Sequence, residues 1–150
     1  MQVIRADEAP RFQLPGVEFT GYAAPARGSA GLCTWRLTVD VGHGGDAPHT
    51  LDRDEVFMVL SGSVQLGEEK LGPGDAVVVP AGEPISLTNL GEEKAELIVA
   101  ITAGFTGYMA DNGELRVRGL SLREGHDVTI EHSAFERMAG FLGFIRAEDV

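Results

Sequence analysis

Residues 44–62 read GGDAPHTLDRDEVFMVLSG, and this stretch says most about the fold. Two glycines open it, and the β-rich run Glu55–Leu60 closes it before Ser61 and Gly62. Valine and phenylalanine are enriched in strands, whereas glycine and serine favour turns. The stretch therefore predicts a bend, a strand and a second turn, from which Ser63–Leu66 returns as a hairpin.

A second informative stretch, residues 74–89, reads GDAVVVPAGEPISLTN. A tight turn at Gly74 leads into Ala76–Val79, which is apolar at every position. We expect this strand to be buried on both faces, since continuous apolar runs are typical of fully buried strands. Pro80 ends the strand, and Ile85–Asn89 follows after a short break.

Further segments carry strand signals of the same kind. Leu32–Val41 alternates with period two, which predicts a half-buried strand. Its apolar face holds Trp35, Leu37, Val39 and Val41. Other predicted strands are Val17–Tyr22, Ala95–Thr102 and Glu114–Val117, and the stretch before Pro15 is expected to form an arm or a short edge strand.

The composition fits one all-β domain. The chain has 150 residues, enough for a single core, and its 20 glycines and 7 prolines are spread along the length. Short strands separated by such turns favour a sandwich or a closed barrel. We expect one domain over residues 1–150, with the barrel at about 17–118 and an extension at 119–150.

The extension changes period. Ser133 and Glu136 have the spacing of a capping box, and apolar residues then recur at three and four. Those residues are Phe135, Met138, Ala139, Leu142 and Ile145. This pattern predicts a C-terminal helix that packs against the barrel exterior or against a second subunit.

Charge and cysteine content limit the partners. The formal net charge of −11 repels phosphate backbones and anionic lipids, so we expect neither nucleic-acid nor membrane binding. A single cysteine allows no internal disulfide. The sequence has no apolar run long enough to cross a bilayer, and its start lacks the apolar region of a secretory signal, which together favour a cytoplasmic protein.

Residues 35–101 resemble the small single-domain cupins. The resemblance is carried by two ordered motifs at family spacing. They comprise Pro48-His49, Asp54-Glu55-Val56-Phe57 and Leu60-Ser61-Gly62 in the first motif, and Gly74-Asp75, Pro80, Gly82 and Asn89 in the second. It implies a double-stranded β-helix, the cupin jelly-roll barrel, in which two antiparallel sheets close on a pocket. It also implies pairing into a homodimer through edge strands, since an exposed edge needs covering.

The same resemblance identifies an altered site. In the family the first motif offers His, His and Glu to a metal, and the second motif offers another His. His49 and Glu55 match, whereas Leu51 and Ile85 stand where the other two histidines belong. A catalytic divalent metal usually has three protein ligands, so we predict that this barrel uses no catalytic metal or other cofactor.

We therefore expect a barrel that binds a small organic molecule, with no catalytic residue assigned. The expected ligand-binding residues are His49, Glu55, Leu51, Ile85, Trp35 and Phe57. One alternative is a metal-independent isomerase, epimerase or cyclase, in which His49 is the acid or base and Glu55 orients it. Another is a metalloenzyme of dioxygenase or isomerase type with an atypical centre. The plainest alternative is a structural His49–Glu55 pair that satisfies itself inside the barrel.

Overall fold

The computed structural model describes residues 1–44, 48–105, 107–111 and 114–117. This part of the chain is all-β, apart from a three-residue 3-10 helix at Pro25–Arg27. The strands are β1 (Arg11–Leu14), β2 (Val17–Gly21), β3 (Leu32–Val39), β4 (His49–Leu51), β5 (Glu55–Ser61), β6 (Val64–Leu66), β7 (Glu69–Leu71), β8 (Ala76–Val79), β9 (Leu87–Thr88), β10 (Ala95–Thr102), β11 (Gly107–Asp111) and β12 (Glu114–Val117).

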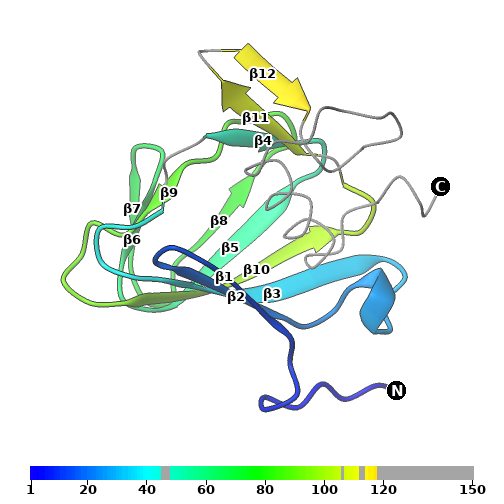
Figure 1. Ribbon diagram of the computed structural model, residues 1–150. Helices are drawn as coiled ribbons and strands as arrows, with labels where there is room; N and C mark the ends of the chain where they lie inside the picture. Colours follow the sequence, from blue (N-terminus) through cyan, green and yellow to red (C-terminus); the bar gives the residue numbers. More distant parts are fainter. Residues whose placement is uncertain (45–47, 106, 112–113, 118–150) are drawn as a thin grey trace.

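The strands form one long sheet and two short ones. The long sheet has the order β1-β2-β3-β10-β5-β8, and the short sheets have the orders β12-β11-β4 and β7-β6-β9. All neighbouring strands are antiparallel. Figure 1 shows the short sheets standing along the top and the side of the long sheet, so that together they wall the barrel. The predicted all-β barrel is confirmed, with its second layer divided in two.

The core lies on the inner face of the long sheet. In β3 the residues Cys33, Trp35, Leu37 and Val39 are buried, which confirms the predicted period-two alternation. Val41 was expected on the same face, but it lies beyond the strand end and is 48% exposed. The inner residues of β5 and β10 complete this layer.

Most of the predicted strands are present. The strands β2, β5, β10 and β12 begin where the sequence predicted, and β1 is the expected short edge strand. The predicted C-terminal helix, and most of the extension that contains it, lie outside the described residues. No helix in the described part of the chain is long and apolar enough to span a membrane.

The predicted hairpin after Gly62 is wrong. The strand β6 pairs with β7 and β9 and makes no pairing with β5. Gly62 has φ +71°, and a Cβ there would lie 2.6 Å from the carbonyl oxygen of Lys94. The glycine therefore lets the chain turn tightly against β10 and cross into the other layer, where a hairpin would have returned along β5.

The expected burial of Ala76–Val79 on both faces is also wrong. This segment is β8, the last strand of the long sheet, and it pairs only with β5. Val79 is buried, whereas Val78 is 61% exposed. The segment thus places apolar residues on the inner face of the sheet and also on its exposed outer face. A run that is apolar at every position does not distinguish this arrangement from a strand buried on both faces.

Candidate functional site

The two sequence motifs meet through their backbones. His49 and Ile85 each donate an N–H to the carbonyl oxygen of the other, with N···O distances of 3.0 and 2.7 Å. Residues paired in this way project their side chains to the same face. Ile85 is 2% exposed, so this face is the barrel interior. The predicted position of Ile85 opposite the first motif is confirmed.

A polar link outside the barrel fixes the same junction. The backbone N–H of Ala81 donates to Oδ1 of Asp54 at 3.0 Å, and that of Gly82 donates to the carbonyl oxygen of Leu51 at 2.7 Å. Asp54 is exposed, as its opposite parity to Glu55 predicts. These links hold the start of β5 against the turn that follows β8.

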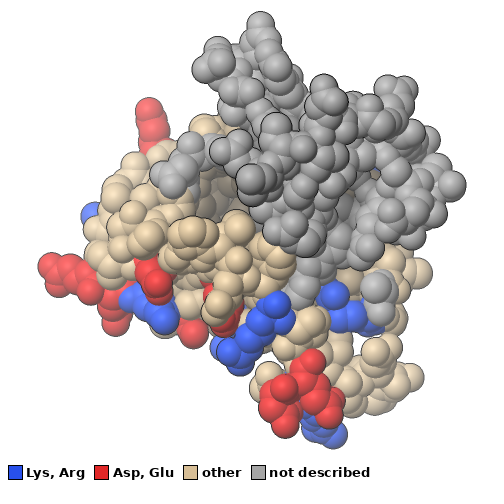
Figure 2. Space-filling model, viewed as in Figure 1, with Lys and Arg blue, Asp and Glu red and all other residues tan. Residues whose placement is uncertain are grey.

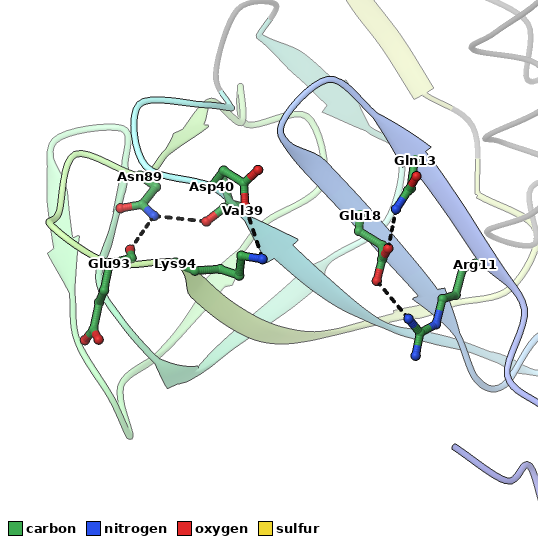
Figure 3. A network of polar contacts seen from close by, with 8 residues as sticks. All are labelled: Arg11, Gln13, Glu18, Val39, Asp40, Asn89, Glu93 and Lys94. Atoms are coloured by element: carbon green, nitrogen blue, oxygen red, sulfur yellow. Dashed lines mark hydrogen bonds and ion pairs between the residues drawn. The ribbon is translucent and has the colours of Figure 1, made fainter. Parts of the chain in front are cut away.

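Asn89, the last residue of the second motif, has a structural role. It is 0% exposed and donates from Nδ2 to the carbonyl oxygens of Val39 at 3.0 Å and Glu93 at 2.8 Å. Its Oδ1 accepts from the N–H of Gly91 at 2.9 Å. Figure 3 shows this side chain joining the end of β3 to the turn before β10. Its hydrogen-bonding groups are used within the fold, so it is not available to a ligand.

Glu55 is also buried, but it differs from Asn89 in its hydrogen bonding. It is the first residue of β5, opposite Val79 on β8 and Ile101 on β10, with Phe57 two residues further on the same face. Glu55 is only 3% exposed, and its Oε2 has no hydrogen-bond partner in the described part of the chain. Burial removes water from the carboxylate and raises the pKa of Glu55 to about 8.

His49 lies on the inner face but is only half-buried. The acid–base alternative needs a hydrogen bond between this imidazole and Glu55. Oε2 of Glu55 has no partner among the described residues, so that oxygen does not orient His49 in this structure.

The four apolar candidates are all buried. Leu51, Ile85, Phe57 and Trp35 are between 2% and 5% exposed. The Trp35 ring stacks on Phe105, with centroids 6.4 Å apart and an interplanar angle of 30°. Phe105 is fully buried and was not foreseen, because a single phenylalanine beyond the end of β10 carries no periodic signal. Contact of these side chains with a ligand stays a prediction.

The residues at the four family positions do not fit a metal. Leu51 and Ile85 provide no donor atom, which leaves one imidazole and one carboxyl group. Within the described ranges, no group of three or more His, Cys, Asp or Glu side chains is placed to hold a metal ion.

The exterior offers a shallow depression of about 250 Å³ between β1, β2, β3 and Lys94. Its polar groups pair with one another and with near neighbours (Figure 3): Gln13 donates to Glu18 at 2.6 Å, and Lys94 lies 3.5 Å from Asp40. Acidic and basic side chains are interspersed on the face shown in Figure 2. The charged side chains that line the depression, Glu18, Asp40 and Lys94, are therefore all paired within the described part of the chain.

Comparison with known proteins agrees with this geometry. The family described as "Cupin domain" matches residues 35–101. None of the curated proteins matches the sequence significantly.

Solved structures show the same fold. KdgF from Halomonas sp. is 24% identical with a TM-score of 0.58, over 68% of this chain and 93% of that one. A cupin-superfamily sugar phosphate isomerase from Silicibacter pomeroyi DSS-3 is 19% identical with a TM-score of 0.62, over 86% and 98%. At these identities the two show the fold alone.

Salicylate 1,2-dioxygenase from Pseudoaminobacter salicylatoxidans is 26% identical with a TM-score of 0.51. The match covers 61% of this chain and 26% of the dioxygenase. The family match, the two ordered motifs and the barrel topology agree. The chain has the cupin fold, and its residues 35–101 match the cupin-domain family.

Proposed function

We propose that this barrel binds a small organic molecule in its interior, with Glu55 forming the polar anchor of the site. The observation that carries the proposal is the buried, unpartnered Oε2 of Glu55. Burying a carboxyl oxygen without a hydrogen-bond partner costs stability, so the position of Glu55 on the inner face is best explained by a ligand that supplies the missing hydrogen bond.

The surroundings define what such a ligand is. Leu51, Ile85 and Phe57 offer apolar contacts, and His49 offers a second polar group on the same wall. Ligand sites commonly combine apolar walls with a few polar groups that set orientation. We expect a largely apolar molecule with a hydrogen-bonding group at one end, bound without a metal. A cytoplasmic location belongs to the same proposal.

A ligand screen tests the proposal. Purified protein is scanned by thermal shift against a library of small metabolites, and hits are titrated by calorimetry with wild type, Glu55→Gln and the exposed control Glu69→Gln. We expect Glu55→Gln to weaken binding by about tenfold or more, and Glu69→Gln to leave it unchanged. Equal affinity of a hit for wild type and Glu55→Gln would remove Glu55 as the anchor.

Metal analysis of the untagged protein accompanies the screen. Protein is offered Fe²⁺, Mn²⁺, Zn²⁺ and Ni²⁺ and its metal content is measured by plasma mass spectrometry. We expect no stoichiometric metal that depends on His49. Stoichiometric metal lost in His49→Ala would instead favour a metalloenzyme and would count against the organic-ligand site.

A second candidate is an acid–base enzyme, and the pKa of Glu55 favours it. With the pKa raised to about 8, the carboxyl group holds its proton at neutral pH and can exchange it with a substrate. In an isomerisation or epimerisation the protons then balance, because one proton leaves a carbon of the substrate and another proton is returned to the product. The acid or base is Glu55 rather than His49, which was the sequence-based choice.

Deuterium exchange tests this candidate without a known substrate. A pool of small carbonyl compounds and sugars is incubated with protein in D₂O, and loss of C–H signals is followed by NMR. Wild type is expected to exchange protons next to a carbonyl, and Glu55→Gln is expected not to. Exchange that persists in Glu55→Gln but disappears in His49→Gln would return the role to His49.

A further inference from the structure

The long sheet ends at β8, and this edge of the sheet is open. In the described part of the chain β8 pairs with β5 and with no strand on its other side (Figure 1). The strand at the opposite edge, β1, carries Arg11, whereas β8 reads AVVV and carries no charge. Val78 in the middle of β8 is 61% exposed. Proteins usually protect an open edge with charged side chains, so an uncharged apolar edge marks a place where a further strand can be added.

The backbone groups on the open side of β8 come from alternate residues. Hydrogen-bonded and non-hydrogen-bonded pairs alternate along an antiparallel ladder. The N–H of Val59 donates to the carbonyl oxygen of Asp75 at 2.9 Å, and this sets the phase of the ladder between β5 and β8. Every second residue of β8, starting at Val77, therefore bonds to β5. The N–H and C=O groups of Ala76 and Val78 point to the open side, where they bond to no other backbone group of the described residues.

The outer face beside this edge is apolar as well. Val56 and Met58 of β5 lie opposite Val78 and Ala76, and Leu60 continues the same face of β5. Leu60 and Met58 are 47% and 36% exposed. An added strand would lie about 4.8 Å beyond β8, and its outward side chains would extend this apolar surface. The face therefore favours apolar side chains at every second position of such a strand.

Both ends of β8 are flanked by carboxylates. Asp75 precedes the strand and Glu83 follows it in the next turn. Asp54 lies at the same end as Glu83, because it accepts from the N–H of Ala81 at 3.0 Å. All three side chains are exposed, and none belongs to an ion pair found among the described residues.

The cations of this region do not neutralise these carboxylates. Arg53 donates to the carbonyl oxygen of Gly104 at 3.3 Å. Arg36 is the only cation that β3, β10, β5 and β8 carry, and β10 and β5 separate it from β8. Lys70 lies on β7 in another sheet, next to Glu69. The edge therefore presents an apolar centre between two negative ends, in a chain whose net charge is −11.

We propose that the open edge of β8 binds an extended peptide segment of another protein, which adds a strand to the long sheet. The segment has apolar side chains at alternate positions and Lys or Arg at both ends. Hydrogen bonds to the backbone of Ala76 and Val78 hold it, and the acidic flanks select its charge. Pro80 has no N–H, so it limits the contact to a short segment. A second copy of this chain, pairing through its own β8, is disfavoured because its acidic flanks would meet these acidic flanks.

Peptide binding with a charge control is the first test. The probes are labelled peptides in which valine alternates with threonine between paired lysines, and their binding is followed by fluorescence anisotropy. We expect a Kd of about 10–100 μM at low salt, weakening as salt is added. The same peptides with glutamate in place of lysine should bind at least about tenfold more weakly. No binding of the basic peptides, or equal binding of both sets, would overturn the proposal.

Backbone methylation distinguishes strand addition from adhesion to the apolar face. Only every second N–H of an added strand points towards β8. A peptide that is N-methylated at those residues cannot form the ladder, whereas methylation of the intervening residues leaves those bonds in place. One of the two methylated peptides should therefore bind and the other should not. Retained binding of both would show that the backbone edge is not used.

Variants of the edge place the site on the protein. Val78→Lys should weaken binding of the basic peptide by at least about tenfold, while Thr102→Lys, exposed on β10 of the same sheet, should leave it unchanged. Glu83→Lys should weaken it about threefold at low salt and not at high salt, with Glu92→Lys as the exposed control. Equal effects of each variant and its control would indicate a response to net charge and would count against this edge. Circular dichroism checks the fold of every variant. No interior ligand is present in these titrations, so their failure is distinguishable from failure of the site at Glu55.

Discussion

Asn89 and Glu55 are both polar side chains that a cupin motif buries, at 0% and 3% exposure, but their surroundings differ completely. Asn89 sits among backbone groups at the end of β3 and makes three hydrogen bonds. Glu55 sits among Val79, Ile101 and Phe57 on the barrel wall, and its Oε2 makes none.

The difference separates a structural position from a functional one. A satisfied buried polar group stabilises the fold and specifies its geometry, whereas an unsatisfied one lowers stability and is retained for another reason. The two cupin motifs thus contain both kinds of residue, and the hydrogen bonds that each buried side chain makes distinguish them. Opposite effects on stability are expected when the two residues are replaced.

The largest expected loss follows from Asn89→Ala. The change leaves the carbonyl oxygens of Val39 and Glu93 and the N–H of Gly91 without their partner. We expect the free energy of unfolding to fall by about 3 kcal/mol, measured by urea denaturation. The control Gln65→Ala removes one exposed bond to Gly67 and should cost far less. Similar small losses in both variants would refute the structural role of Asn89.

The opposite sign is expected for Glu55→Gln. Glutamine keeps the shape of the side chain but cannot ionise, so it avoids burying a charge at high pH. The pKa of Glu55 is about 8 in the folded protein and near the ordinary value of 4.5 when unfolded. Between these values the folded state holds a proton that the unfolded state has lost, so wild-type stability falls as pH rises from about 4.5 to about 8.

The stabilisation of Glu55→Gln relative to wild type is therefore small at about pH 4 and grows to a few kcal/mol, as an order of magnitude, above about pH 8. Urea denaturation across this pH range measures it, with Glu69→Gln as the exposed control. A pH-independent difference would show that Glu55 titrates normally, and the contrast with Asn89 would then fail.

A smaller effect is expected next to Glu55 in the sequence. Asp54 points outward and accepts from the N–H of Ala81 at 3.0 Å. Asp54→Ala should lower the free energy of unfolding by about 1 kcal/mol, because water replaces the lost acceptor at this exposed site. Asp54→Asn keeps the acceptor oxygen and should retain most of the stability. A loss as large as that of Asn89→Ala would mean that exposure is not what separates the two sites.

The sequence predicted the barrel because periodicity and turn residues act locally. The alternation in β3 and the bounds of β10 followed from the side-chain pattern alone. The partner of a strand is set by long-range pairing, which is why β6 was wrongly given to a hairpin and β8 wrongly buried. In both cases a short apolar segment did not reveal which sheet it joined or how near the edge it lay.

The candidate site was predictable only in part. The resemblance to the cupins placed Ile85 opposite His49, as the structure confirms. It gave no indication that Oε2 of Glu55 is unpartnered, or that Trp35 stacks on Phe105, because these facts depend on how several strands meet.

The smallest effect is expected for Lys94→Gln, in the same turn that Asn89 braces. Lys94 Nζ lies 3.5 Å from Asp40 Oδ1, and both side chains are more than half exposed. Solvent screens such a pair, so its loss should change the free energy of unfolding by less than about 0.5 kcal/mol in urea denaturation at moderate salt. The substitution leaves the hydrogen bond from Asn89 to the backbone carbonyl of Glu93 intact, so it tests the contribution of the ion pair alone to the stability of this turn. A loss above about 1 kcal/mol, diminishing with added salt, would assign the bracing to the ion pair instead of the buried amide.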